Sequence, residues 1–186
     1  MVRVELSDYY ERHAADYFEQ TFNVDMSFLY DRFLVRIPEG GAILDAGCGS
    51  GRDAKAFAEL GYSVSAVDAS ANMAALARQV EGLNVRVCRF EDLDYEAEFD
   101  GVWACASLVH LGPPLLRRAV SRLAASLRPG GYLYASFKYG LGVEQDAGRT
   151  YVRQNEATVH DLFGAEPLLR LEEYWMTVDE RAGRAD

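Results

Sequence analysis

Residues 42–51 read Ala-Ile-Leu-Asp-Ala-Gly-Cys-Gly-Ser-Gly and are the most informative part of the sequence. An apolar run ends in a loop that carries Gly47, Gly49 and Gly51, and a helical pattern begins at Arg52. Glycines in such a loop let the backbone turn sharply and let a ligand approach without a Cβ in the way. The start of the next helix adds unpaired N–H donors and the positive end of a dipole. The stretch therefore predicts a strand–loop–helix unit that binds a ligand at its glycines.

The spacing of the glycines argues against the dinucleotide fingerprint G-x-G-x-x-G, because the third glycine of that pattern falls at Arg52. Asp45 precedes the loop, where it suits a ligand with a cationic amino group and would repel a pyrophosphate. Asp68 ends the next apolar run, where a carboxylate can accept hydrogen bonds from both hydroxyls of a ribose. The alternative is that the two acids cap loops and the glycines only form a turn.

Short apolar runs alternate with helical patterns, which is typical of a parallel sheet covered by helices. We expect strands at 42–46, 63–68, 85–89, 101–106 and 132–137. The helices expected between them are 52–60, 71–80 and 113–127. Helices at 7–21 and 25–36 precede the first strand, and an irregular stretch, a helix at 155–163 and a last strand at 168–178 follow the fifth. The predicted fold class is α/β, a Rossmann-like, doubly wound, mostly parallel sheet with helices on both faces.

Composition limits the function classes. The chain has 186 residues, 49% hydrophobic and 26% charged, which fits one domain over 1–186. No apolar run approaches the roughly 20 residues of a membrane span, and the N-terminus lacks an apolar signal core, so we expect a cytoplasmic protein without membrane contact. A net charge of -10 argues against nucleic acid as a partner. The three cysteines fit reduced thiols, and no Cys/His spacing predicts a metal.

Residues 42–51, Asp68, Glu91-Asp92 and Leu-Arg-Pro-Gly-Gly at 127–131 together resemble the class I S-adenosylmethionine-dependent methyltransferases. The resemblance covers roughly residues 5–178 and implies S-adenosyl-L-methionine as cofactor, with S-adenosyl-L-homocysteine as product. In that family the glycine loop wraps the methionine part, and the acid matching Asp68 holds the ribose. We add Ala106 and Ser107, which end the fourth expected strand. The candidate cofactor-binding residues are then Tyr17, Asp45, Ala46, Gly47, Cys48, Gly49, Gly51, Arg52, Asp68, Ala69, Met73, Glu91, Asp92, Leu93, Ala106 and Ser107.

Two further segments, 9–17 and 137–151, resemble a bacterial subgroup of small-molecule methyltransferases often labelled tellurite-resistance-like. In that subgroup an N-terminal tyrosine closes over the cofactor, and Tyr17 is the match. The resemblance divides the chain into an N-terminal helical lid (1–38), a cofactor-binding core (39–137) and a substrate-side segment (138–186). Core packing and a solvated loop are the alternatives for the two segments. The candidate substrate-binding residues are Tyr9, His13, Lys138, Tyr139, Arg149 and Tyr151.

Methyl transfer from a sulfonium is an in-line displacement, so the protein mainly aligns the two reactants and excludes water. Ligands bind at the carboxyl ends of the strands in open α/β sheets, and the fourth expected strand leads to His110. Neutral imidazole can contact a substrate or act as a base near pH 7, so His110 is the candidate catalytic residue. Packing at the start of the next helix is its alternative role. The acceptor is expected to be a small molecule.

Two other functions are alternatives, namely a catalytically weak cofactor-binding sensor or partner subunit and a nicotinamide oxidoreductase. The family sheet has seven strands, and after Val178 only a short polar segment remains. We therefore expect the seventh strand to be missing and six strands to form the sheet. The exposed edge of the fifth strand would then be free to pair with another chain, so the protein is expected to be a monomer or a homodimer.

Overall fold

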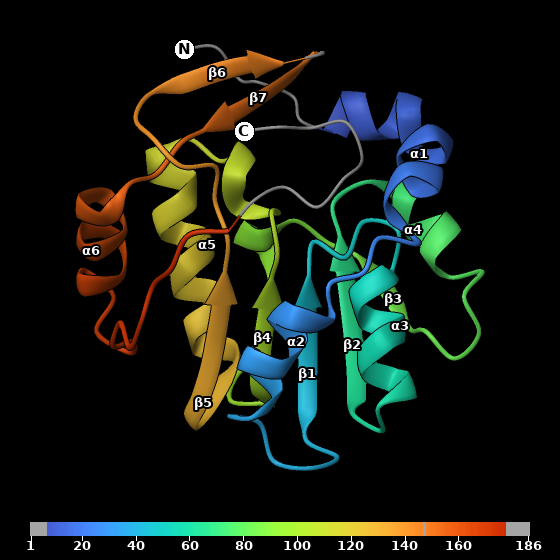
Figure 1. The fold of residues 1–186 in the computed structure, drawn as a ribbon, viewed down its shortest axis with the longest axis horizontal. Helices are drawn as coiled ribbons and strands as arrows, with labels where there is room; N and C mark the ends of the chain where they lie inside the picture. Colours follow the sequence, from blue (N-terminus) through green and yellow to red (C-terminus); the bar gives the residue numbers. More distant parts are fainter. Residues whose placement is uncertain (1–6, 147, 178–186) are drawn as a thin grey trace.

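The computed structural model describes residues 7–146 and 148–177 and contains a five-stranded parallel sheet between two layers of helices (Figure 1). The strand order is β3-β2-β1-β4-β5, which confirms the predicted doubly wound fold. The order reverses between β1 and β4, and ligands of such sheets bind at the carboxyl ends of the strands there. The strands are β1 (Ala42–Ala46), β2 (Ser63–Asp68), β3 (Val85–Val87), β4 (Phe99–Ala104) and β5 (Leu127–Ala135).

The helices lie close to their expected positions. Each begins within about two residues of the predicted start, and Ser70 caps α4 by accepting a hydrogen bond from the Met73 N–H at 3.1 Å. Single 3₁₀ turns, η1 (Phe90–Asp92) and η2 (Leu108–His110), follow β3 and β4. The helices are α1 (Ser7–Thr21), α2 (Ser27–Leu34), α3 (Arg52–Glu59), α4 (Ala71–Ala77), α5 (Pro113–Ser126) and α6 (Glu156–Gly164).

Alternate residues of the central strands face opposite layers, as the two-residue period of a strand requires. Ile43 and Trp103 are fully buried against α2 and α3, with Phe57 among their neighbours. Leu44 and Val102 are fully buried on the other face, against α5 and α6. Because both faces are covered, the central strands are apolar on both sides, and only their carboxyl ends remain available for chemistry.

The connection between α5 and β5 differs from the prediction. The helix ends at Ser126, and β5 begins at Leu127 and continues through Pro129. Phe99 pairs with Leu127, and the pairing then shifts so that Gly101 faces Tyr132. Proline has no N–H for a ladder hydrogen bond, which explains why the register is interrupted there.

The stretch expected to be irregular forms a β-hairpin. Strands β6 (Val143–Asp146) and β7 (Arg149–Val152) pair antiparallel as a two-stranded sheet of their own. Figure 1 shows this hairpin beyond the carboxyl ends of the parallel strands, at the same end of the molecule as α1. Residues far apart in the sequence thus gather at one end of the sheet.

The last strand predicted at 168–178 is wrong for the described residues, because 165–177 contain no strand, and Val178 lies outside the described residues. The segment packs instead by side chains. Trp175 lies against the Tyr134 ring and under the Arg32 guanidinium, and Glu173 pairs with Arg36 at 3.3 Å. These contacts hold the segment against α2 and one face of β5 without a hydrogen-bond ladder. Within the described residues the parallel sheet therefore has five strands, not six.

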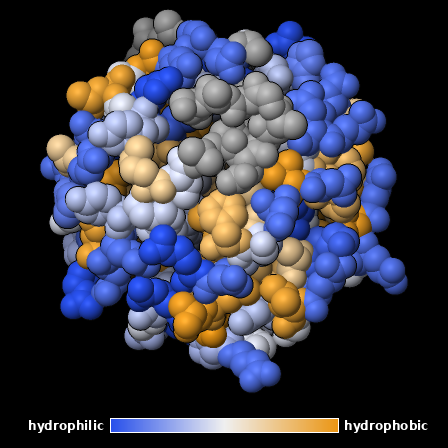
Figure 2. Space-filling model, in the orientation of Figure 1, coloured by the Kyte–Doolittle hydropathy of each residue, from blue (hydrophilic) through white to orange (hydrophobic). Residues whose placement is uncertain are grey.

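In residues 7–146 and 148–177, no helix is both long and apolar enough to cross a membrane. Cys48, Cys88 and Cys105 are all free thiols. On the face shown in Figure 2, hydrophobic side chains lie in small groups between hydrophilic ones. Such scattered groups are ordinary on a folded surface.

Candidate functional site

The glycine loop joins β1 to α3 in the conformation that its sequence predicts. Gly47, Gly49 and Gly51 have φ angles of 80°, 53° and 77°, a region that residues with a Cβ rarely adopt. Gly47 also faces a close neighbour, since a Cβ built there would lie 2.4 Å from the Cβ of Ser107. The Ser107 hydroxyl donates to the carbonyl of Ala46 at 2.7 Å. The end of β1 and the turn after β4 therefore touch at the loop.

Asp68 closes the other side of the loop. One carboxylate oxygen accepts a hydrogen bond from the Gly49 N–H at 2.8 Å, and the other accepts from the Ser70 N–H at 2.8 Å. Burial raises the pKa of this carboxyl, and its backbone hydrogen bonds oppose that rise. Backbone N–H groups of Gly49, Ala69 and Ser70 bond to this carboxylate, which has about four acceptor sites and so retains a lone pair for a hydroxyl donor.

Asp45 lies deeper than expected. It is 2% exposed, and its carboxylate accepts a hydrogen bond from the Ala54 N–H at 3.1 Å, inside the first turn of α3. Burial, together with the negative charge of Asp53, holds its pKa well above the ordinary value. The carboxylate is thus bonded to the helix start that follows the loop, and its role toward a ligand stays a prediction.

Sequence reasoning missed Asp53, which organises the residues behind the loop. Its carboxylate accepts hydrogen bonds from Arg52 Nε at 2.6 Å, from the Tyr30 hydroxyl at 2.6 Å and from Trp103 Nε1 at 2.8 Å. Asp53 is 6% exposed, so these donors compensate a buried charge. The only sequence signal for Asp53 was its position directly after the glycine loop and Arg52. That signal is weak, because acids are common in the first turn of helices, where they interact favourably with the helix dipole.

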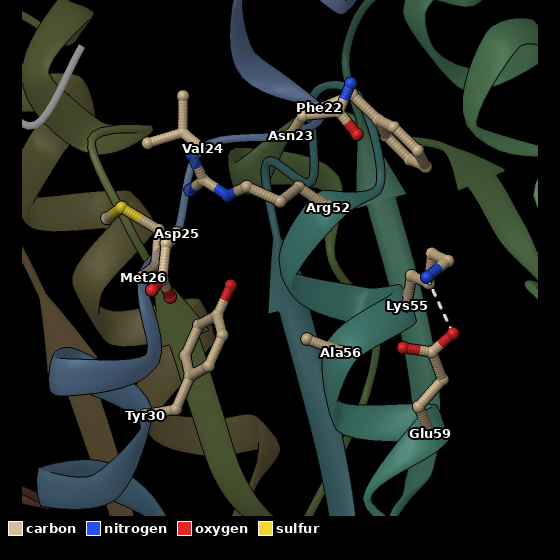
Figure 3. A pocket seen from close by; sticks show the side chains of 10 residues that line it. All are labelled: Phe22, Asn23, Val24, Asp25, Met26, Tyr30, Arg52, Lys55, Ala56 and Glu59. Atoms are coloured by element: carbon tan, nitrogen blue, oxygen red, sulfur yellow. Dashed lines mark ion pairs between the residues drawn. The ribbon is translucent and has the colours of Figure 1, made fainter.

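A groove of about 210 Å³ opens beside Arg52, between α3 and the connection from α1 to α2 (Figure 3). Figure 3 shows Arg52 extending toward Val24 and Asp25, with the Tyr30 hydroxyl pointing to it from α2. Lys55 is paired with Glu59 at 2.6 Å on the outer side. Because Arg52 directly follows Gly51, the groove adjoins the end of the glycine loop.

The residues predicted around the adenine lie in the segments that follow β2 and β3. Ala69 is exposed, whereas Met73 is 1% exposed and belongs to the core. Leu93 is 2% exposed, and Asp92 beside it is exposed. The carbonyl of Glu91 accepts a hydrogen bond from Arg118 at 3.2 Å. Met73 and Leu93 therefore present little surface to a ligand, and Ala69 and Asp92 stay the better candidates here.

Helix α1 lies across the loop and is held at several points. Tyr17 is the ring nearest Gly49, with Cε1 3.5 Å from a Cβ built at that glycine. The Thr21 hydroxyl is 3.2 Å from the Ser50 hydroxyl, and a Glu11 carboxylate oxygen accepts hydrogen bonds from the N–H groups of Ala71 and Asn72. The helix is kinked at His13, whose φ is -117°. This position agrees with the predicted closure over the loop, and the lid role itself stays a prediction.

His110 lies between three segments. Its Nδ1 is 2.6 Å from the carbonyl oxygen of Thr150, and its Nε2 is 2.9 Å from the hydroxyl of Tyr10. A carbonyl can only accept, so Nδ1 donates and Nε2 accepts from Tyr10. Burial lowers the pKa of His110 to about 4, and the charges of Arg149 and Lys138 act in the same direction. The imidazole is therefore neutral near pH 7.

Four of the six predicted substrate residues gather next to His110. We call the set of Tyr9, Tyr10, His110, Lys138, Arg149 and Tyr151 the aromatic–cation cluster. The Arg149 guanidinium lies 5.1 Å from the Tyr9 ring centroid and 5.4 Å from that of Tyr151, and Lys138 Nζ lies 4.3 Å from the Tyr151 centroid. These distances are those of cation–π contacts. Tyr10 was not among the predicted site residues, although it lies next to Tyr9 in the sequence.

Two predicted substrate residues lie outside the cluster. Tyr139 is 51% exposed, and its hydroxyl bonds to Glu156 at 3.3 Å. The His13 ring is tilted against that of Tyr9 with centroids 4.7 Å apart, its side chain is 48% exposed, and its Nδ1 is 3.9 Å from Asp16. Ala106 is exposed at the end of β4 with a φ of 49°, and its N–H donates to Ser136.

No group of three or more His, Cys, Asp or Glu side chains that could hold a metal lies within the described ranges.

A parallel sheet in this order, with a glycine loop after β1 and an acid at the end of β2, defines the class I S-adenosylmethionine-dependent methyltransferase fold. Residues 43–131 match the sequence model of a family described as a methyltransferase domain. Residues 43–131 thus form a methyltransferase domain, and the resemblance to the class I methyltransferases predicted from the sequence is confirmed. The narrower tellurite-resistance-like resemblance stays a prediction.

Two kinds of known protein are similar to the chain. It is 38% identical over 105 residues to a ubiquinone biosynthesis O-methyltransferase of Xanthomonas campestris, over 52% of this chain and 43% of that protein. The enzyme of that name from Methylocella silvestris is 39% identical over 112 residues, again over 43% of its length. The chain thus spans less than half the length of the curated relatives it matches.

Solved structures overlap with more of the chain than these two relatives do. The 1,6-didemethyltoxoflavin-N1-methyltransferase of Burkholderia thailandensis, solved with its substrate and S-adenosylhomocysteine, is 28% identical with a TM-score of 0.70. The match covers 87% of this chain and 75% of that one. The magnesium protoporphyrin IX methyltransferase of Synechocystis, at 20% identity and a TM-score of 0.68, shares the fold.

Proposed function

We propose that the chain is an S-adenosylmethionine-dependent methyltransferase that methylates a small molecule by in-line displacement. The observation that carries the proposal is the contact of Asp68 with Gly49, which brings a carboxylate with spare acceptor capacity to a loop that has glycine at three of its five positions. The methyltransferase domain match and the similar toxoflavin enzyme, which holds S-adenosylhomocysteine, support the same cofactor here.

The described residues fit that cofactor. Asp68 would accept the ribose hydroxyls, and the loop from Gly47 to Gly51 would lie against the methionine part. Ala69 and Asp92 would flank the adenine, and Tyr17 would cover the loop from α1. A bound S-adenosylmethionine supplies a methyl group already activated on a sulfonium, so the protein needs alignment more than acid–base strength.

The chain's own part in the reaction is to hold an acceptor against that methyl group and to exclude water. The aromatic–cation cluster lies at the carboxyl end of β4, next to Ser107 and the loop, and offers that surface. His110 presents a neutral Nε2 that now accepts from Tyr10 and would accept from an acceptor's N–H or O–H if Tyr10 moved. Its low pKa makes it a weak base, so we assign it to substrate contact.

Calorimetric titration with S-adenosylmethionine and S-adenosylhomocysteine tests the proposal. We expect micromolar binding of both, no binding of NADH, and a loss of at least about 30-fold in affinity for Asp68→Ala, in line with the removal of hydrogen bonds to a charged group. Asp161→Ala, which removes a carboxylate with a 77% exposed side chain on α6, is the matched control and should bind as the wild type does. A folded wild type that binds neither compound, or that binds NADH instead, contradicts the proposal.

Turnover is measured next, as S-adenosylhomocysteine formed in the presence of a panel of small acceptors. Formation above the background rate for at least one acceptor supports methyl transfer. Binding without turnover on a broad panel would leave only the cofactor part of the proposal and contradict the enzymatic part.

A further inference from the structure

Arg149 is the most unusual charged residue near the site. It is 5% exposed at the start of β7, and its Nε is buried without a hydrogen-bond partner among the described residues. A buried guanidinium normally has all its donors bonded to carboxylates or carbonyls, because an unpaired donor away from water is costly. Arg149 therefore retains a donor that faces protein, not water.

The carboxylates beside Arg149 compensate its charge only in part. Asp146 lies 3.5 Å from its NH2 group, which is a long ion pair, and the Asp146 side chain is 38% exposed. Glu144 is shared between Arg153 at 2.7 Å and Lys138 at 3.6 Å. Three cations thus face two carboxylates around the hairpin, in a protein with a net charge of -10.

The other walls of the cluster are aromatic. The rings of Tyr9 and Tyr151 both contact the guanidinium, and Tyr10 packs edge to face on Tyr9 and on His110. The His110 ring tilts against that of Tyr151 with centroids 4.8 Å apart. Rings in this arrangement bind a planar ring by stacking and edge contacts. A guanidinium between them supplies a planar fork that matches a carboxylate.

We propose that Arg149 selects the methyl acceptor, which is a planar ring that carries a carboxylate and binds between the tyrosines of the aromatic–cation cluster. Lys138 adds a second positive charge on the same side. The inference rests on the proposed function, because it assigns the acceptor end of the same site.

The state of His110 supports this assignment. The charges of Arg149 and Lys138, together with burial, disfavour its protonation, so the region around the imidazole already favours negative charge. An anionic acceptor would be attracted by the positive charges of Arg149 and Lys138, whereas a cationic acceptor would be repelled by them. The carboxylate would displace the weak Asp146 contact and use the free Nε donor.

Matched pairs of ring acids and their amides test the inference, with benzoate against benzamide and 2-naphthoate against 2-naphthamide as probes. Binding to the protein saturated with S-adenosylhomocysteine is measured by calorimetry or by ligand-observed NMR. We expect each acid to bind at least 10-fold more tightly than its amide. Arg149→Met should abolish the preference, and Arg149→Lys should retain part of it, since it keeps the charge but not the fork.

Arg153→Met is the matched control, because Arg153 lies just after the same hairpin and pairs with Glu144 outside the cluster. It should keep the preference for acids. Melting temperatures show whether each variant folds. If Arg149→Met does not fold, the test rests on Arg149→Lys, whose preference for acids over amides should be clearly below that of the wild type. Equal binding of acids and amides, no binding of either, or an unchanged preference in both Arg149 variants overturns the inference.

The two proposals fail in different ways. A protein that does not bind S-adenosylhomocysteine contradicts the proposed function. A protein that binds it with micromolar affinity and shows no preference for ring acids contradicts only the assignment of the acceptor.

Discussion

The hydroxyl of Tyr10 lies 2.9 Å from Nε2 of His110, and this hydrogen bond joins α1 to the turn after β4. The other imidazole nitrogen donates to the Thr150 carbonyl at 2.6 Å, so the same ring also reaches β7. One buried side chain thus links the N-terminal helix, the central sheet and the hairpin.

Removing the Tyr10 hydroxyl should weaken that link. Tyr10→Phe leaves Nε2 of buried His110 without its donor, and an unsatisfied buried acceptor costs about 1–3 kcal/mol. We expect the free energy of unfolding in urea to fall by about that amount. Tyr174→Phe is the control, because Tyr174 is 54% exposed, and it should change stability by less than about 0.5 kcal/mol. Equal stability of the two variants would show that the hydrogen bond contributes nothing.

His110 should also make stability depend on pH. Its pKa is about 4 in the folded protein and 6.5 in a chain without burial, so between these values the unfolded state binds the proton and the folded state does not. Stability therefore falls as the pH is lowered from about 6.5 to 4, by up to about 3 kcal/mol.

His110→Gln isolates this contribution, because glutamine can keep both hydrogen bonds but does not titrate. The difference in unfolding free energy between wild type and His110→Gln should shrink or change sign as the pH falls through that window. His160→Gln, which alters an exposed histidine, should track the wild type. Parallel curves for all three proteins would contradict the depressed pKa.

The glycine loop makes a prediction about packing. Gly47→Ala meets both a φ of 80° and a Cβ contact of 2.4 Å with Ser107, whereas Gly61→Ala meets a φ of 90° in open space. The second variant should lose about 1–2 kcal/mol for the left-handed backbone alone. The first should lose about 1–3 kcal/mol more, from overpacking. Thermal unfolding of both variants measures the difference, and similar losses would mean that Ser107 moves aside freely.

Replacement of Asp53 is expected to lower the free energy of unfolding strongly. Asp53→Ala leaves Arg52, Tyr30 and Trp103 without their shared acceptor, and breaking a buried charged network costs about 3–5 kcal/mol. Urea unfolding followed by Trp fluorescence measures that loss. Asp161→Ala removes an exposed ion pair and should cost less than about 1 kcal/mol. A loss for Asp53→Ala no larger than that for Asp161→Ala would show that the three donors find other partners.

The parts of the fold that sequence predicted are those set by local rules. The strand–loop–helix unit at 42–51 and the acid at Asp68 follow from glycine chemistry and from a two-residue apolar period, and both depend on residues near one another. The doubly wound class of the sheet follows from the resemblance and from the alternation of elements. These features needed no knowledge of distant contacts.

The parts that sequence missed depend on distant contacts. The strand pattern at 168–178 has apolar residues at suitable intervals, but the segment packs through Trp175 and Glu173 and forms no ladder. Residues 143–152 are too polar to stand out as strands. The burial of Arg149 runs against the usual exposure of arginine, so only the folded arrangement reveals it.

The hairpin β6–β7 forms a small sheet of its own, apart from the five parallel strands that carry the glycine loop and Asp68. Two of the residues expected to recognise the acceptor, Arg149 and Tyr151, therefore lie on a piece of backbone separate from the glycine loop and Asp68, which are expected to hold the methyl donor. Substitutions in the ten residues 143–152 could retune acceptor choice while leaving the donor end untouched. The methyl-transfer step can therefore stay the same while the choice of acceptor changes. A graft of this hairpin between related chains would be a direct route to new acceptors.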